Sequence, residues 1–173
     1  MPKRSAGLLV YRRRNGGPNH GQDHGQDRGH DGGSVIGLEV FLVHPGGPLW
    51  AKKDCGAWSI PKGEYDAAEP PLQAAIREFG EETGFSVGGD FLDLGVIRQA
   101  GGKLVSAWAC ASDFDPAQLI SNECEIEWPP RSGQRILIPE VDRGAWFDLA
   151  EARTRILESQ QEFLDRLLER LPA

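Results

Sequence analysis

The sequence predicts an α/β fold in which a central mixed β-sheet carries helices on its faces. Apolar segments of strand length alternate along the chain with two segments of helical periodicity. This order of elements is typical of a sheet that is covered by helices. At 39% apolar residues, the 173-residue chain can build one core without disulfides. We therefore expect a single domain over residues 1–173.

The first two predicted strands flank a segment of different composition. Residues 5–14 and 35–44 are rich in β-branched and other apolar side chains, which favour strands. Between them, residues 15–34 hold almost nothing apolar and repeat Gly-Gln-Asp. Such a segment cannot offset its ordering entropy by burial, so we expect a low-complexity surface insertion in a hairpin. Nothing nearby would fix the geometry of an alternative metal site built from its three histidines, His20, His24 and His30.

Helices are predicted in two places. The first runs from about residue 69 to residue 83, where Pro70 and Pro71 suit the first turn and Gly84 suits the C-terminal end. The second region, residues 148–171, has apolar side chains at helical spacing and predicts one or two amphipathic helices.

Further strands are predicted between these helices. Residues 91–99 and 102–111 have strand composition and are joined by a tight turn at Gly101-Gly102. A strand around 122–128 and a short one at 135–139 flank a loop that contains two prolines.

The composition limits the classes of partner. A formal net charge of −7 and a pI of about 5.1 argue against a dedicated nucleic-acid-binding protein. An anionic small molecule is compatible with this charge, because a divalent cation can mediate the contact. No apolar run approaches the ~20 residues of a membrane span, and the N-terminus lacks the apolar stretch of a signal peptide. We expect a cytoplasmic protein whose thiols are reduced, since no metal or redox spacing joins Cys55, Cys110 and Cys124.

The helix predicted at 69–83 has two distinct faces. One face is apolar and repeats at three- and four-residue spacing: Leu72, Ala75, Ile76 and Phe79. The other carries carboxylates at positions i, i+3 and i+4: Glu78, Glu81 and Glu82. Like charges at this spacing destabilise an isolated helix by roughly a few tenths of a kcal/mol per pair. We expect a helix that keeps such a cluster to bind something positive.

Hard divalent cations meet this requirement, although a solvated Glu-rich helix face is the alternative interpretation. Mg²⁺ or Mn²⁺ takes oxygen ligands and leaves positions for phosphate oxygens. Such an ion neutralises phosphate charge and acidifies water, and a free carboxylate can take the proton. Hydrolysis of a phosphoanhydride needs little beyond positioning and charge stabilisation.

The segment from Gly63 to Phe85 decides between these interpretations. It reads GEYDAAEPPLQAAIREFGEETGF and satisfies the pattern G-x5-E-x7-R-E-U-x-E-E-x-G-U, in which U is a bulky apolar residue. From average residue frequencies, a chance match is on the order of 10⁻⁷. The pattern is the Nudix box, so the chain resembles the Nudix hydrolase superfamily over these 23 residues. The resemblance implies an α/β/α sandwich with a central mixed sheet and the box in a loop–helix–loop.

By this resemblance, Glu78, Glu81 and Glu82 are implied as metal ligands, together with the carbonyl of Gly63. The implied cofactor is Mg²⁺ or Mn²⁺. Glu82 or Glu78 is alternatively the group that orients or deprotonates the attacking water.

Other carboxylates and one arginine have supporting roles by the same resemblance. Arg77 resembles the residue that pairs with the box carboxylates, with a plain surface ion pair as the alternative. Glu69 is implied as a supporting residue, or is simply a charge near the helix N-terminus. Some family members recruit one more carboxylate from a later strand or loop, for which this chain offers Glu123, Glu125, Glu127 and Glu140. Alternation places Glu123, Glu125 and Glu127 on one strand face. We favour Glu125 or Glu127, with a solvated strand face as the alternative.

Substrate contacts are implied by a shorter likeness. Residues 58–63, WSIPKG, resemble the W-x-x-P-K-G that leads into the box in hydrolases of diadenosine tetraphosphate and related polyphosphates. Lys62 is therefore a candidate phosphate contact. Lys52 and Lys53, on the preceding loop, are further candidates, with ordinary solvated lysines as the alternative. Arg131, in the loop WPPRSG, is a separate candidate. Three tryptophans either stack on a nucleotide base or pack in the core: Trp58, Trp50 and Trp128.

The sequence leaves the exact substrate open. Gly101, Gly102 and Lys103 stand where dinucleoside polyphosphate hydrolases often carry a Tyr, and Ala100 where ADP-ribose hydrolases often carry a Pro. We expect Mg²⁺-dependent hydrolysis of a nucleoside diphosphate-linked substrate, first a diadenosine polyphosphate that is cleaved asymmetrically. A nucleoside triphosphate is the second candidate. A catalytically silent Nudix-fold regulatory module that binds nucleotides is the alternative of another class. Either a monomer or a homodimer is expected.

Overall fold

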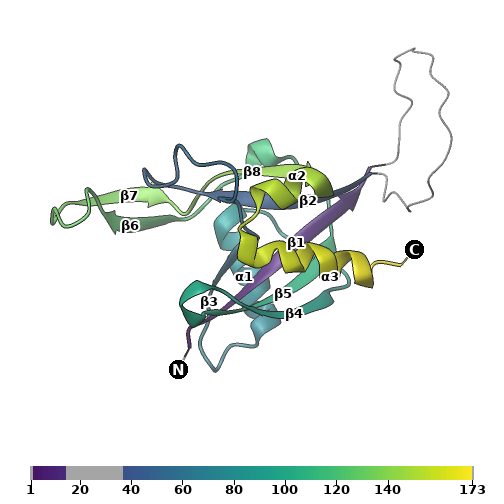
Figure 1. The fold of residues 1–173 in the computed structure, drawn as a ribbon. Coiled ribbons are helices and arrows are strands. Elements are labelled where there is room, and N and C mark those ends of the chain that lie inside the picture. Colours follow the sequence, from purple (N-terminus) through teal and green to yellow (C-terminus); the bar gives the residue numbers. More distant parts are fainter. Residues whose placement is uncertain (1, 15–36, 173) are drawn as a thin grey trace, which may run out of the picture.

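The computed structural model describes residues 2–14 and 37–172 (Figure 1). The predicted insertion at 15–34, with its histidines, lies outside the described residues. The strands are β1 (Arg4–Arg13), β2 (Leu38–Pro45), β3 (Lys62–Glu64), β4 (Leu92–Arg98), β5 (Leu104–Ala111), β6 (Glu123–Glu127), β7 (Arg135–Pro139) and β8 (Val141–Asp148). The α-helices are α1 (Pro71–Thr83), α2 (Leu149–Arg155) and α3 (Gln161–Arg170), and short 3₁₀ turns are η1 (Ala100–Gly102), η2 (Pro116–Gln118) and η3 (Glu158–Gln160).

The main sheet is mixed, as the sequence predicts. Its strands follow the order β4-β5-β1-β2-β8, and β3 also pairs with β1. β1 runs parallel to β5, with Arg4 opposite Leu104 and Tyr11 opposite Ala111. The other pairs in this sheet are antiparallel. β6 and β7 form a separate antiparallel hairpin that projects from the body of the molecule (Figure 1).

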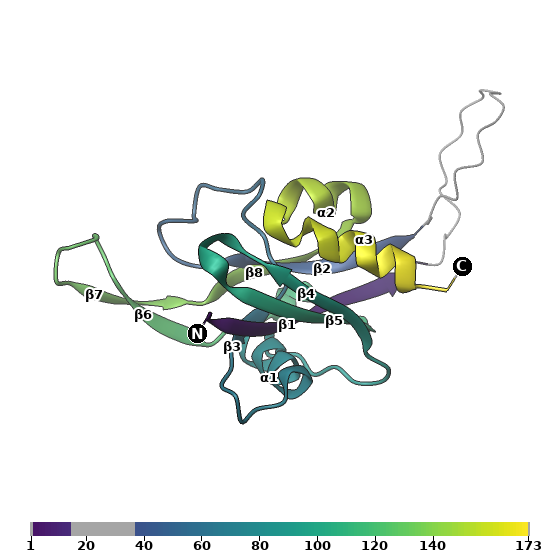
Figure 2. The ribbon, with the colours of Figure 1, turned by 60° about the horizontal axis from the view of Figure 1, so that its bottom comes forward.

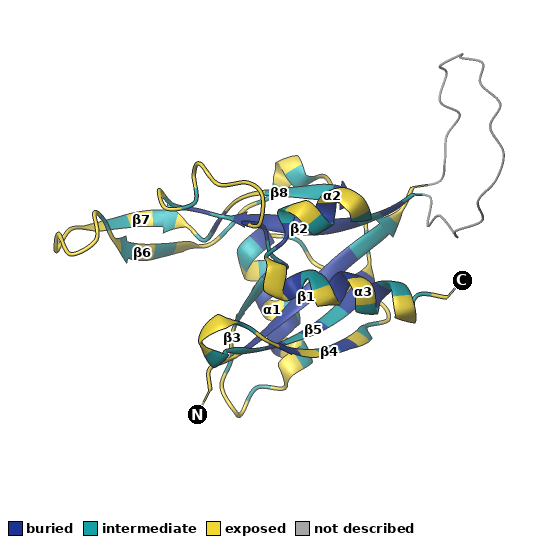
Figure 3. Ribbon diagram, viewed as in Figure 1, coloured by how far each residue is buried: buried dark blue, intermediate teal, exposed yellow. Residues whose placement is uncertain are grey.

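Helices cover both faces of the sheet: α1 lies on one face, and α2 and α3 lie on the other (Figure 2). β1 contributes side chains to the cores on both faces of the sheet, because successive side chains of a strand point to opposite faces. Leu9 joins the core under α2 and α3, whereas Leu8 and Val10 join the core under α1. Figure 3 shows that β1 is buried through its centre, which explains its nearly continuous apolar run.

Helix α1 begins and ends where its sequence dictates. Pro70 and Pro71 have no backbone N–H to donate, so they fit a helix start, and the first helical residue is Pro71. The helix ends at Gly84, whose φ of 75° is left-handed and whose N–H donates to the carbonyl of Gly80. Within the described ranges, the helices are too short or too polar to cross a membrane.

Two strands, β3 and β8, are absent from the sequence prediction. β3 is only three residues long and has no apolar periodicity of its own. β8 carries Asp142, Arg143 and Gly144, which weaken a strand signal. Position 144 requires a glycine, because the ring of Phe41 lies against the α-carbon of Gly144 and leaves no room for a side chain. Pairing with β2, rather than local preference, therefore makes β8 a strand.

Candidate active site

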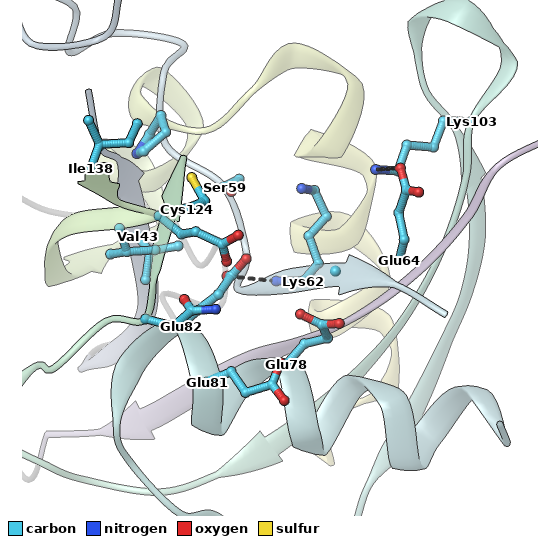
Figure 4. A pocket seen from close by; sticks show the side chains of 16 residues that line it. Val43, Ser59, Lys62, Glu64, Glu78, Glu81, Glu82, Lys103, Cys124 and Ile138 are labelled. Carbon is cyan, nitrogen blue, oxygen red and sulfur yellow. Dashed lines mark hydrogen bonds and ion pairs between the residues drawn. The ribbon is translucent and has the colours of Figure 1, made fainter. Parts of the chain in front are cut away.

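Helix α1 separates its apolar face from its carboxylates. The apolar face packs on the sheet through Ala74, Ala75 and Phe79. Glu78, Glu81 and Glu82 instead line a pocket of about 600 Å³ between α1, β3 and the base of the β6–β7 hairpin (Figure 4). We call this the acidic pocket. Its further polar lining consists of Ser59, Lys62, Glu64, Lys103, Asn122 and Glu140, and its apolar lining includes Val43, Pro45, Cys124, Ile138 and Val141.

Gly63 and Glu78 meet at the floor of the acidic pocket. β3 pairs with β1, which places Gly63 opposite Ala6 and against α1. The α-carbon of Gly63 faces the Glu78 carboxylate so closely that a β-carbon would collide with it. Glu78 is only 8% exposed, and burial raises the pKa of its carboxyl, although the charge and hydrogen bond of Arg77 oppose this rise. A buried carboxylate is thus held against the β3 backbone.

Glu82 is held by the backbone of the same strand. The N–H of Lys62 donates to Oε2 of Glu82 over 2.9 Å. Burial raises the pKa of the Glu82 carboxyl to about 8, although the charge and N–H of Lys62 oppose it. Burial also lowers the pKa of the Lys62 ammonium group. Both groups are therefore costly to keep charged at this end of the pocket.

Arg77 donates hydrogen bonds to three carboxylates of the box. Its Nε and Nη2 donate to the two oxygens of Glu69, each over 2.8 Å. Its Nη1 donates to Glu78 over 2.7 Å and to Glu81 over 3.0 Å. These partners raise the pKa of Arg77, and the Arg77 hydrogen bonds lower the pKa of the Glu69 carboxyl. Arg77 therefore fixes Glu78 and Glu81 relative to Glu69.

Glu140 is the carboxylate that the structure adds to the acidic pocket from outside the box. Its N–H donates to the carbonyl of Asn122 over 3.0 Å, and its charge contributes to the raised pKa of Glu82. The structure does not bring the favoured candidates, Glu125 and Glu127, into this lining. Glu125 pairs with Arg135 on the exposed hairpin face, and Glu127 accepts the N–H of residue 133. Strand alternation explains this placement, since the half-buried side chains of β6 are Cys124 and Ile126.

The donor set fits a hard divalent cation. In residues 2–14 and 37–172, no three His, Cys, Asp or Glu side chains converge closely enough to enclose an ion. The contacts give the reason: Arg77 draws Glu78 and Glu81 to itself, while Glu82 accepts from the β3 backbone. The donors that the box supplies are nonetheless carboxylate and carbonyl oxygens, which Mg²⁺ and Mn²⁺ prefer. Because Gly63 has no side chain, its backbone can lie directly against the Glu78 carboxylate.

Of the substrate residues expected from the sequence, Lys62 alone lines the acidic pocket. Lys52 is exposed, and Nζ of Lys53 lies 4.7 Å from the centre of the Trp50 ring. Trp58 is 3% exposed and belongs to the core under α2 and α3, which leaves no face for a base. The loop between β6 and β7 holds the remaining two, Trp128 and Arg131.

Several lining residues were not singled out as site residues by the sequence analysis. Lys103 and Glu64 come from η1–β5 and β3, and Lys103 Nζ lies 3.4 Å from Oε1 of Glu64. Asn122 links Glu81 to Glu140, because its N–H donates to the carbonyl of Glu81 and its carbonyl accepts from the N–H of Glu140. These positions depend on strand register and loop packing, so no local pattern indicates them.

A mixed sheet between helices, with one helix presenting its carboxylates to a pocket, defines an α/β protein with an acidic loop–helix–loop site. The chain belongs to the NUDIX domain family, whose model matches residues 36–167. The predicted α/β/α fold and the predicted family are both confirmed.

Solved structures share this fold at low identity. The Ap4A hydrolase of Caenorhabditis elegans in a binary complex is 20% identical, with a TM-score of 0.53 and 96% of both chains covered. The NUDIX domain of Shewanella oneidensis NrtR in complex with ADP ribose is 17% identical, with a TM-score of 0.58, covering 99% of this chain and 90% of that one.

One curated relative matches a short segment. The m7GpppN-mRNA hydrolase dcap-2 of C. elegans is 61% identical over 31 residues, which are 18% of this chain. The match spans only 4% of the length of that relative.

Proposed function

We propose that this chain hydrolyses a phosphoanhydride bond in a nucleoside diphosphate-linked substrate, with Mg²⁺ or Mn²⁺ as cofactor. One observation carries the proposal: α1 turns Glu78, Glu81 and Glu82 into a pocket that also holds Lys62 and Lys103. Carboxylates for a divalent ion and ammonium groups for phosphates are what this reaction needs in one place.

The residues of the acidic pocket have different roles in the proposed reaction. Glu78, Glu81 and Glu82, with the carbonyl of Gly63, would hold the divalent ion. When bound, that ion supplies charge neutralisation for the phosphate oxygens and acidifies water. Arg77 keeps two of these carboxylates oriented through the hydrogen bonds it donates.

A proton acceptor is needed for the attacking water. Glu78 and Glu82 are within the box, and Glu140 faces them from the base of the hairpin. Lys62 orients the phosphate chain, because its ammonium group lies in the pocket beside these carboxylates.

A diadenosine polyphosphate, cleaved asymmetrically, is the substrate that we propose first. The name of one structural neighbour, Ap4A hydrolase, and that of the short-segment relative, m7GpppN-mRNA hydrolase, both describe two nucleosides joined through phosphates. A nucleoside triphosphate is the second candidate, because it presents one base instead of two and the described lining of the acidic pocket contains no aromatic residue.

The experiment is a substrate panel with products resolved by mass. Purified protein with Mg²⁺ is given nucleoside triphosphates, dinucleoside polyphosphates, ADP-ribose and capped dinucleotides, with a chelator as the control. We expect Mg²⁺-dependent cleavage of a phosphoanhydride, and incorporation of ¹⁸O from labelled water identifies the phosphorus attacked. Binding without cleavage across the panel would instead support a regulatory module.

A further inference from the structure

A second hollow opens beside the acidic pocket. We call it the side pocket; it has a volume of about 490 Å³ and is lined by Pro2, Lys3, Arg4, Glu64, Tyr65 and Ala67. Glu64 also lines the acidic pocket, so the two hollows lie on either side of this one residue. The contact of β3 with the N-terminal end of β1 brings the two linings together, with Ser5 opposite Glu64.

Two lysines flank Glu64 at this boundary. Nζ of Lys3 lies 3.2 Å from Oε1 of Glu64, on the side-pocket side. Nζ of Lys103 lies 3.4 Å from the same oxygen, on the acidic-pocket side. Two ammonium groups against one carboxylate leave a net positive charge. These ion pairs are partly exposed and therefore weak, so a phosphate can compete with Glu64 for both lysines.

The residues that line the acidic pocket differ in character from one end to the other. Figure 4 shows Cys124 and Ile138 at one end, the helix carboxylates and Lys62 in the middle, and Lys103 with Glu64 at the other end. Cations therefore continue from Lys62 past Lys103 toward the side pocket. Of the residues that line the two pockets, the cations beyond Lys62 lie in this direction.

The far end of this path has an aromatic surface. Among the residues that line either pocket, Tyr65 alone is aromatic. Most of the exposed lining of the side pocket is apolar, in contrast to the acidic pocket. An apolar, aromatic surface beyond a row of cations fits a nucleoside that ends a phosphate chain.

We propose that the side pocket is a subsite for the distal nucleoside of a dinucleoside polyphosphate, whose phosphates cross Glu64 between Lys103 and Lys3. This inference rests on the proposed function and adds to it a second subsite and a direction of binding. The subsite favours longer phosphate chains, because a chain must pass Lys103 before it reaches Lys3 and Tyr65.

The first test neutralises Lys3, which lines the side pocket and not the acidic pocket. Steady-state kinetics are measured for ATP, adenosine 5′-tetraphosphate and diadenosine tetraphosphate with wild type and with Lys3→Met. We expect KM for both tetraphosphates to rise about fivefold with kcat nearly constant, and KM for ATP to stay close to that of wild type. The matched control is Arg170→Met, which removes an exposed cation that lines neither pocket.

Two further variants separate the parts of the subsite. Glu64→Gln releases both lysines, so it should lower KM for the tetraphosphates, opposite in sign to the lysine variant. Tyr65→Ala should raise KM about fivefold for diadenosine tetraphosphate but not for adenosine 5′-tetraphosphate. Because Tyr65 also packs on the core under α1, Ala67→Glu serves as a second variant; Ala67 is exposed, and its new charge would repel the phosphates from the side pocket without touching the core.

The outcomes distinguish this inference from the proposed function. If wild type cleaves these compounds but the variants change KM equally for all three, the side pocket is no subsite and the proposed function stands. If wild type cleaves other members of the substrate panel but none of these three compounds, the inference fails and the proposed function stands; if it cleaves no member of the panel, both fail. A rise in KM confined to the tetraphosphates, reversed in sign by Glu64→Gln, supports the subsite.

Discussion

The α-carbon of Gly63 lies directly against the carboxylate of Glu78, and no side chain fits between them. This contact joins a three-residue strand to the box helix, so the glycine is required by space and not by backbone conformation. It places a buried carboxylate beside backbone oxygens, which is the arrangement on which the proposed cation site depends.

Gly63→Ala should therefore displace Glu78 and lower turnover by about 10²-fold, because misplacing a ligand by about an ångström is costly. The control is Gly80→Ala in the same helix, where a β-carbon meets only the carbonyl of Phe85 at 3.7 Å. Gly80→Ala should keep full activity and unfold at a slightly higher temperature, since alanine favours a helix. Equal activity in the two variants would remove the role of Gly63.

Glu81→Gln and Glu82→Gln should each lower turnover by about 10²-fold or more while the fold survives. Glu140→Gln tests the additional carboxylate and should also lower kcat. The control is Glu125→Gln on the exposed hairpin face, which should retain wild-type kinetics. Circular dichroism checks folding in every variant. Near-wild-type turnover in both box variants would contradict the assigned site.

Arg77→Lys should lower kcat about tenfold, because lysine cannot reproduce the bidentate contact to Glu69 together with those to Glu78 and Glu81. The change in unfolding free energy should stay within about 1 kcal/mol, since the Arg77 side chain is 38% exposed. Kinetics and thermal unfolding of the same preparation separate these effects. A large loss of stability with unchanged kcat would mean that Arg77 serves only the fold.

The raised pKa of Glu82 predicts how the metal-free protein responds to pH. A carboxyl whose pKa is about 8 when folded and about 4.5 when unfolded binds more protons in the folded state between these values. Its contribution to stability is therefore present at low pH and is lost as pH rises toward 8. In a chelator, Glu82→Gln should raise Tm relative to wild type at pH 8.5, with little difference near pH 5. Added Mg²⁺ should stabilise wild type more than the variant.

Deleting residues 16–33 should leave Tm and turnover close to wild type. The composition of this segment indicates little burial, and the flanking residues already pair: the N–H of Arg14 donates to the carbonyl of Gly37 over 2.6 Å. A short connection can therefore close the hairpin of β1 and β2. Loss of activity on deletion would place the histidine-rich segment in the site.

Sequence reasoning predicted the helix of the box, its ends and its carboxylate face, because these follow from local spacing and from Pro and Gly. It also predicted that Glu123, Glu125 and Glu127 share a strand face. It could not predict which face of β6 turns inward, since that depends on how the hairpin packs on the loop at Gly47, where Ile138 makes contact. Glu140 and Lys103 reach the pocket through the same kind of non-local packing.

The cation site is tested most directly by a crystal structure grown with Mn²⁺ and a non-hydrolysable dinucleoside polyphosphate. We expect anomalous density for Mn²⁺ in contact with carboxylates of Glu78, Glu81 and Glu82, and with a phosphate of the ligand. Manganese bound elsewhere, with Arg77 still holding these carboxylates, would contradict this cation site.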